Sequence, residues 1–105
     1  MSWYVLDDMM KDLSGFQRDI LYVIAGMGDG EYPHGLSIKD ELEQHYEREI
    51  NHGRLYPNLD ELVEMDLVEK GTIDRRTNSY TLTQRGHREI EDRREWENQY
   101  VDLEI

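Results

Sequence analysis

The spacing of apolar residues in this 105-residue chain changes from a helical period to alternation after residue 66. Before the change, the clearest helical pattern lies in residues 14–27. Ser14 and Gln17 have the spacing of a capping box at its start. The pattern therefore predicts an amphipathic helix, whose apolar face consists of Phe16, Ile20, Val23, Ile24 and Met27.

Two further helices are expected before that change. Residues 35–46 carry an acidic face opposite an apolar one, which consists of Ile38, Leu42 and Tyr46. A third helix begins after Asn51, whose side chain can act as the N-cap, and ends near Met65. Pro57 falls in its second turn and cannot donate a hydrogen bond to Gly53, so we expect a kink or a loosened first turn. The apolar residues of this third helix are Leu55, Leu59, Leu62 and Val63.

A β-hairpin and a long helix are expected in the rest of the chain. Residues 67–73 alternate apolar and polar side chains, residues 74–79 have the composition of a turn, and residues 80–82 read as a second short strand. Thr83 has the position of an N-cap for a final helix that reaches Tyr100. Apolar residues are sparse in this last helix, which therefore has little with which to build a core.

This order predicts a mainly α fold with a small β-hairpin (α+β), of the winged helix-turn-helix type. The third helix is then the recognition helix and the hairpin is the wing. We expect a single domain over residues 1–105, with three parts. These are an N-terminal interface segment (1–13), the winged helix (14–82), and a long C-terminal dimerisation helix with its tail (83–105).

The charge distribution bears on a DNA-binding role. The formal charge is −12, with 24 acidic and 12 basic residues, which disfavours contact with phosphates. However, residues 48–58 and residues 68–80 each sum to +1, and these ranges contain the start of the expected recognition helix and the wing. Many acidic residues with only three lysines are typical of proteins that stay soluble in molar salt. The composition therefore favours a halophilic protein with two surfaces suited to DNA.

Composition also excludes several classes of protein and site. The absence of cysteine excludes disulfides, thiolate metal sites and thiol redox chemistry. No apolar run approaches the ~20 residues of a membrane span, and the amino terminus lacks a basic leader. A cytoplasmic protein is therefore expected. We find no nucleophile–base pair, phosphate-cradling glycine loop or metal-ligand spacing, so no enzyme, cofactor or metal site is expected.

The residues expected to contact DNA belong to the recognition helix and the wing. Arg54 can bind guanine with two hydrogen bonds, and Gly53 allows a phosphate to approach the backbone. Each residue also has an ordinary interpretation, such as a solvated Arg54, a core-packed Tyr56 or a merely capping Asn51. The full expected set is Asn51, Gly53, Arg54, Tyr56, Pro57, Asn58, Lys70, Arg75 and Arg76.

Three segments resemble the PadR-like winged-helix transcription regulators: "PHGLSIKDEL", "HGRLYPNLDELVEMDLVEKG" and "YTLTQRGHREI". The resemblance covers roughly residues 14–96. It implies a homodimer held by the last helix, which binds a pseudo-palindromic operator and usually represses transcription. The acidic composition is similar to that of haloarchaeal members, which include a regulator of the response to oxidative stress. The short C-terminus departs from many relatives, so an effector site borrowed from them is in doubt.

The residues themselves also favour a dimer. The last helix is too polar for a monomer core, yet Trp96 and Tyr100 need to be covered. We expect the last helices to pair across a two-fold axis with the N-terminal segments packed against them. The expected dimer-interface residues are Trp3, Tyr4, Leu6, Met10, Ile90, Trp96 and Tyr100.

Some alternatives remain open at this stage. Winged helices can also act as protein-interaction modules without DNA binding, and the overall acidity favours that reading. Aromatic residues of the expected dimer interface can line a pocket for a small-molecule effector or can simply form the interface core. Carboxylates such as Asp60 and Glu61 can hold cations between the protein and phosphates, and direct contacts would then survive high salt, because charges are screened over about 3 Å at ~1 M.

Overall fold

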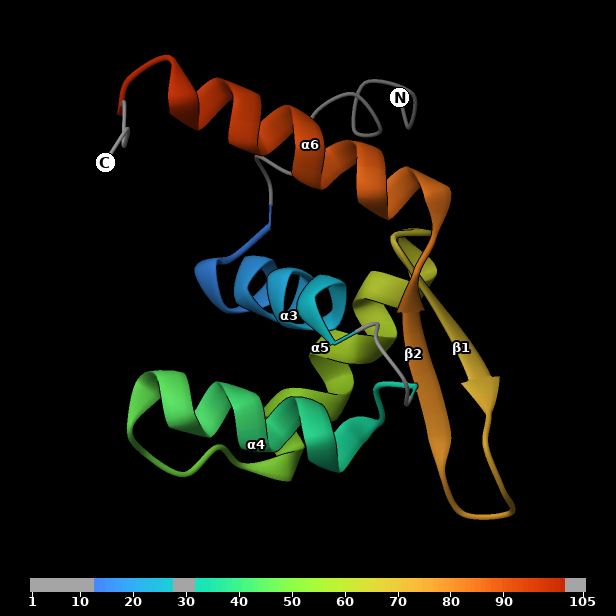
Figure 1. The fold of residues 1–105 in the computed structure, drawn as a ribbon. Coiled ribbons are helices and arrows are strands. Elements are labelled where there is room, and N and C mark those ends of the chain that lie inside the picture. The colour runs from blue at the N-terminus through green and yellow to red at the C-terminus, as the bar shows by residue number, and fades with distance from the viewer. Residues whose placement is uncertain (1–12, 28–31, 102–105) are drawn as a thin grey trace.

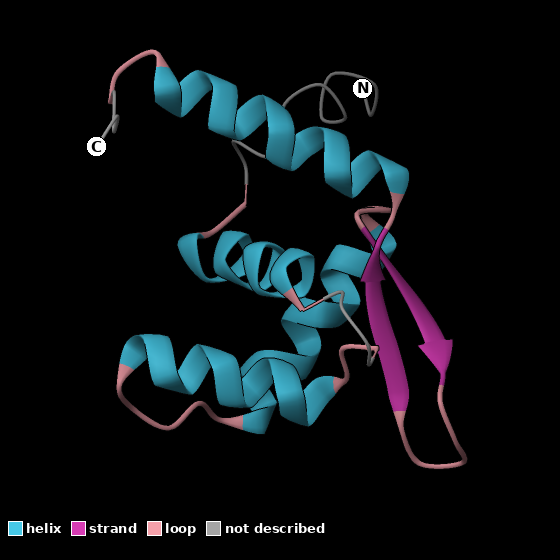
Figure 2. Cartoon of the chain, in the orientation of Figure 1, coloured by secondary structure: helices cyan, strands magenta, loops and turns pink. Residues whose placement is uncertain are grey.

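A computed structural model describes residues 13–27 and 32–101 of the chain. Four helices and one hairpin follow in the expected order (Figures 1 and 2). The protein is thus an α+β winged helix, as the sequence predicts. The elements are α3 (Gly15–Gly26), α4 (Gly35–Tyr46), α5 (His52–Glu64), β1 (Val68–Thr72), β2 (Asn78–Leu82) and α6 (Gln84–Asn98).

The three N-caps predicted from the sequence are all present. Ser14 and Gln17 form the reciprocal capping box of α3, with both hydrogen bonds 3.2 Å long. The Asn51 side chain accepts a hydrogen bond from the Gly53 amide at 2.6 Å, and Thr83 accepts one from the Gly86 amide at 2.9 Å. These caps satisfy backbone donors that have no partner within their helices.

Helix α5 continues through Pro57 from His52 to Glu64. In its first turn, the Asn51 carbonyl accepts two hydrogen bonds, one from the Arg54 amide at 3.0 Å and one from the Leu55 amide at 3.1 Å. Three leucines on the inner face, Leu55, Leu59 and Leu62, are completely buried. Burial of each contributes about 1.5–3 kcal/mol, which holds the helix in place despite its proline.

The wing is an antiparallel hairpin in which Val68 pairs with Leu82 and Thr72 pairs with Asn78. It is attached to the start of α4 by an isolated bridge between His34 and Ser79. The Tyr80 amide also donates a hydrogen bond to the Pro33 carbonyl at 2.8 Å. The wing and the amino-terminal end of α4 therefore form one rigid corner.

Helix α3 lies at the centre of the fold, in contact with α4, α5, α6 and β2 (Figure 1). Its residues Ile20, Leu21 and Ile24 are almost fully buried, together with Ile38 and Leu42 of α4. Within the described residues, no helix is both long and apolar enough to cross a membrane.

Candidate nucleic-acid interface

The elements expected to bind DNA lie at one end of the molecule. The amino-terminal parts of α4 and α5 and the tip of the hairpin lie at the end of the fold away from α6 (Figure 1). The local folding explains this arrangement, because the cap at Asn51 starts α5 where the chain leaves α4, and the Asp74–Thr77 turn closes the hairpin. The start of α5 carries Asn51, Gly53 and Arg54, and the hairpin turn carries Arg75 and Arg76, whereas Lys70 lies in the middle of β1.

Arg54 is exposed on the first turn of α5, and its guanidinium stacks on an aromatic ring. Its Cζ lies 3.9 Å from the centroid of the Phe16 ring, which is itself 7% exposed. Phe16 in turn stacks with Tyr46 at 6.1 Å between centroids, and the Tyr46 hydroxyl donates a hydrogen bond to Asp19. Within the described chain, no hydrogen bond or ion pair engages the Arg54 guanidinium. The Phe16 ring therefore covers one face of the planar Arg54 guanidinium, while the N–H donors of the guanidinium stay free.

Asn58 is engaged within the protein. Its Oδ1 accepts a hydrogen bond from Gln17 Nε2 at 3.0 Å, and its Nδ2 donates one to the Arg54 carbonyl at 2.7 Å. The same Gln17 amide donates to Glu61 Oε2 at 2.7 Å. The bond to Gln17 therefore links α5 to α3, and the bond to the Arg54 carbonyl lies within α5, so both polar groups of the expected DNA-contact residue Asn58 are engaged inside the protein.

Tyr56 is partly packed against the protein and partly exposed, and the sequence had left open whether it packs in the core or contacts DNA. It is half-buried, and its ring and hydroxyl lie directly over Gly35, where a Cβ atom would overlap them. The His52 ring stacks on it at 5.6 Å between centroids. Glycine at position 35 is therefore what allows α4 and α5 to approach this closely.

Two arginines lie at the wing tip, and both are exposed. In the part of the chain that the structure describes, neither Arg75 nor Arg76 forms an ion pair. The turn is held by Asp74, whose carboxylate accepts a hydrogen bond from the Arg76 amide at 2.9 Å. That bond, with a second from the Thr77 side chain, lowers the pKa of Asp74. Lys70 lies 3.9 Å from Asp60, a long and exposed pairing that leaves its charge accessible.

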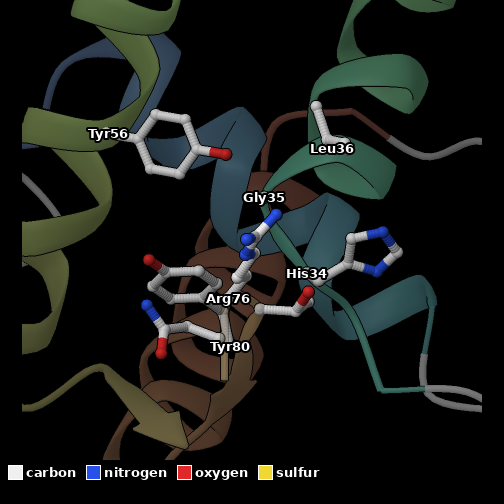
Figure 3. Close-up of a pocket in the computed structure, with 8 residues that line it drawn as sticks. His34, Gly35, Leu36, Tyr56, Arg76 and Tyr80 are labelled. Carbon is white, nitrogen blue, oxygen red and sulfur yellow. The ribbon is translucent and has the colours of Figure 1, made fainter. Parts of the chain in front are cut away.

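A small polar pocket of about 150 Å³ opens between α4, α5 and β2. Figure 3 shows the Tyr56 hydroxyl directed toward Gly35, with Arg76 and Tyr80 on the other side of the pocket. We call it the corner pocket. Its lining residues are His34, Gly35, Leu36, Tyr56, Arg76, Thr77, Asn78 and Tyr80.

The opposite end of the molecule carries an apolar surface on the last turn of α6 and the residues that follow it, although the sequence predicts that the helix reaches Tyr100. Trp96 and Tyr100 are 47% and 71% exposed, and their rings lie 5.1 Å apart. Ile90, which the sequence assigns to the dimer interface, is 9% exposed and belongs to the core of the single chain. The other expected interface residues, Trp3, Tyr4, Leu6 and Met10, lie outside the described residues.

Comparison with known proteins places this chain in a family. A model of the PadR-like transcriptional regulator family matches residues 20–92. The chain belongs to the PadR-like family. A structure described as a complex of RosR is 46% identical, covers 90% of this chain and 81% of its own, and has a TM-score of 0.82. RosR of H. salinarum, grown from NaBr, gives a TM-score of 0.81 at the same identity, over 90% of this chain and 83% of its own.

A more distant structure shares the fold alone. It is a winged-helix DNA-binding protein from STIV, 20% identical, with a TM-score of 0.68 over 90% of this chain and 100% of its own. No curated protein matches the chain with significance. As a PadR-like protein, this chain is a DNA-binding transcription regulator and not an enzyme. The expected family and fold are thereby confirmed.

Four residues that contact or border the candidate interface have no DNA-facing role in the sequence prediction. Phe16 and Gln17 were interpreted only as core and capping residues, and Gly35 and Tyr80 only as parts of their elements. Their contacts join residues far apart in the chain, such as Gln17 and Asn58, which are 41 positions apart. Local periodicity carries no signal for such pairs.

Proposed function

We propose that the protein is a homodimeric repressor that binds a pseudo-palindromic operator, with α5 of each protomer in a major groove. The observation that carries this proposal is Arg54, whose stacked guanidinium has all its donors free at the start of α5. A guanidinium held in this way can donate two parallel hydrogen bonds to the O6 and N7 atoms of guanine. The Gly53 backbone beside it is suited to a close phosphate.

The wing supplies the second set of contacts in this proposal. Arg75 and Arg76 are exposed at the tip of the hairpin, on the same end of the molecule as α5. Arginines in that position fit a narrow minor groove or its flanking phosphates. Lys70 contributes from β1, and Asn51 and Pro57 line the flank of α5.

The dimer would form through the apolar surface of α6. Trp96 on α6 and Tyr100 and Val101 directly after it are exposed together, beside a helix whose other residues are mostly charged. Pairing across a two-fold axis would cover them and set two copies of α5 about 34 Å apart, one turn of DNA. The N-terminal segment 1–13 would complete this interface.

High salt is the condition under which such an acidic regulator would bind DNA. Screening over about 3 Å at ~1 M salt removes the long-range repulsion between the protein and DNA. Contacts from Arg54 and the wing arginines then act locally. Cations held between carboxylates and phosphates would offset the remaining repulsion, although no metal-binding cluster is found among the described acidic and histidine residues. A stress signal would act by shifting this binding.

The test is a binding titration with a promoter-derived duplex and a scrambled duplex, from low to multimolar KCl. The proposal requires specific binding, two protomers per duplex, and an affinity that falls little as salt rises. A steep loss of affinity with salt would refute the high-salt mechanism. Failure to bind duplex DNA at any salt would refute the proposal and favour a protein-interaction module.

A further inference from the structure

We infer that the junction between Gly86 of α6 and the Leu67 backbone sets the half-site spacing that the dimer recognises on DNA. Gly86 and Thr83 would then be positioning residues, which act on DNA through the separation of the two recognition helices. This inference rests on the proposed function, because it needs two protomers that pair through α6. It assigns a part in operator specificity to residues at the end of the fold away from the wing tip (Figure 1).

Helix α6 begins in direct contact with the segment that leaves α5. Gly86 is buried, and a Cβ atom added there would overlap the Leu67 carbonyl oxygen and lie 3.2 Å from the Leu67 carbonyl carbon. Both atoms belong to the backbone, so no change of side-chain rotamer at Leu67 would make room. Glycine at position 86 is therefore what allows α6 to lie this close to Leu67.

Thr83 fastens the same junction with three hydrogen bonds. Its hydroxyl donates to the Asp66 carbonyl at 2.6 Å and accepts from the Gly86 amide at 2.9 Å. Its own amide donates to the Leu67 carbonyl at 3.1 Å. The cap of α6 is therefore bound directly to the two residues that connect α5 to the wing.

The other side of the junction is fixed to the carboxy-terminal end of α5. The Leu67 amide donates a hydrogen bond to the Leu62 carbonyl at 3.1 Å, and the Asp66 amide donates one to the Val63 carbonyl at 3.0 Å. Leu62 and Leu67 are completely buried. Asp66 has a φ of 62°, which is uncommon for a residue other than glycine and persists where the surroundings hold it. The junction therefore transmits the orientation of α6 to α5 with little freedom to adjust.

The direction of α6 depends strongly on this junction. Its buried residues, Gly86 and Ile90, both lie in its first half. Trp96, which is exposed on the proposed dimer surface, follows Gly86 by ten positions, which is about 15 Å along a helix. A change of angle at Gly86 would therefore displace the dimer surface relative to α5. A two-fold axis would repeat the change in the partner, so the separation of the two recognition helices would change twice over.

Half-site spacing on DNA is sensitive to such a displacement. One base pair inserted between two half-sites moves the second by about 3.4 Å and rotates it by about a tenth of a turn. A dimer whose recognition helices are held at a fixed separation can follow both changes only by deforming the DNA, which lowers affinity. The rigid junction therefore predicts a sharp preference for one spacing.

The test is a series of duplexes in which the two half-sites are separated by the native spacing, one base pair fewer or one more. Wild-type protein should bind the altered spacings about tenfold more weakly. In Gly86→Ala the difference should shrink to about threefold or the preferred spacing should move, while binding to a single half-site stays as in wild type. The matched control is Gly26→Ala, whose added Cβ meets nothing within 4 Å and which should keep the wild-type preference.

Thr83 supplies a second pair of variants. Thr83→Val removes the hydroxyl and both of its hydrogen bonds, so it should weaken the spacing preference. Thr83→Ser keeps the hydroxyl and should retain the preference. Thermal melting identifies a variant that does not fold, and if Gly86→Ala is one, the comparison of the two Thr83 variants decides.

The separation of the recognition helices can also be measured without DNA. Because the chain has no cysteine, Asp60→Cys places one spin label on the exposed side of α5. Double electron–electron resonance on the labelled dimer reports the distance between the two copies of α5. Gly86→Ala should shift or broaden that distance, and Gly26→Ala should leave it unchanged.

The outcomes separate this inference from the proposed function. If wild-type protein is monomeric or binds no duplex, the proposed function is wrong and this inference fails with it. If the dimer binds DNA without a preferred spacing, or if Gly86→Ala keeps both the wild-type preference and the wild-type distance, only the inference is wrong. An equal loss of affinity on the single half-site in Gly86→Ala would also overturn it, because the junction would then act within one protomer.

Discussion

The Arg54 guanidinium lies over the Phe16 ring, with its Cζ 3.9 Å from the ring centroid. This stack joins the recognition helix α5 to the start of the central helix α3. It covers one face of the guanidinium and leaves the N–H donors at its edge free for a ligand. A long side chain that is already held loses less conformational entropy when it binds, so in the proposed complex the stack would prepare Arg54 to read a base.

Replacing Phe16 by leucine should weaken base discrimination more than it weakens the fold. Leucine keeps an apolar side chain in the core and costs about 1–2 kcal/mol of stability, but it removes the ring. The preference for guanine over other bases at the contacted position should therefore fall, while Phe16→Tyr should retain it. Binding measured on duplexes that differ at that base gives the preference. The matched control is Ile24→Val, a core change with a similar cost that should leave the preference unchanged.

Replacing Asn58 by alanine should lower stability without changing base preference. The change removes hydrogen bonds of 3.0 Å to Gln17 and 2.7 Å to the Arg54 carbonyl, at a cost of about 1 kcal/mol. Combining it with Gln17→Ala in a double-mutant cycle should show coupling between the two residues. A selective loss of preference for one adenine in Asn58→Ala would instead show that this residue reads a base.

Replacing Gly35 by alanine should destabilise the fold by about 1–3 kcal/mol, because the new Cβ would overlap the Tyr56 ring. Replacing the Tyr56 ring by a smaller side chain in the double variant Gly35→Ala/Tyr56→Leu should recover part of this loss of stability. Chemical denaturation measures the stability of both variants. The control is Gly26→Ala at the end of α3, where an added Cβ meets nothing within 4 Å. Equal stability of the two alanine variants would contradict the close approach of α4 and α5.

Replacing Trp96 and Tyr100 together by serine should convert the dimer into a monomer. Trp96 of α6 and Tyr100 just after it are both exposed among the described residues, and a second copy of the chain would cover them in the proposed dimer. Sedimentation should report one protomer, and affinity for a two-half-site duplex should fall far more than affinity for a single half-site. Ile73→Ser removes another exposed apolar side chain, from the wing turn, and should leave the protein dimeric. A dimeric double variant would mean that another surface holds the protomers together.

The order of elements and their caps could be predicted because those signals are local. Ser14, Asn51 and Thr83 each cap a residue two or three positions ahead, and the apolar spacing of α3 and α5 identifies the buried faces. The burial of Ile90 could not be predicted in the same way. Its helix is sparse in apolar residues, and its burial follows from the packing of α6 against α3 and β2.

The candidate site shows the same division between local and distant contacts. Arg54 and the wing arginines were identifiable as exposed cations near a helix start and in a turn. The engagement of Asn58 depends on Gln17, and the placement of Tyr56 depends on Gly35, residues that lie on other helices. A sequence pattern lists such side chains as possible contacts, but only their tertiary partners show which of them remain free.

The central claim is that Arg54 reads a guanine from α5. The most direct measurement compares wild type and Arg54→Ala by fluorescence anisotropy in molar KCl, on an operator duplex and on one with 7-deazaguanine at the contacted position. Wild type should lose about 1–3 kcal/mol of binding free energy on the modified duplex. Arg54→Ala should bind both duplexes with the same affinity, equal to that of wild type for the modified duplex. Arg88→Ala, an exposed arginine of α6, should behave as wild type. Full sensitivity to 7-deazaguanine in Arg54→Ala would contradict the claim.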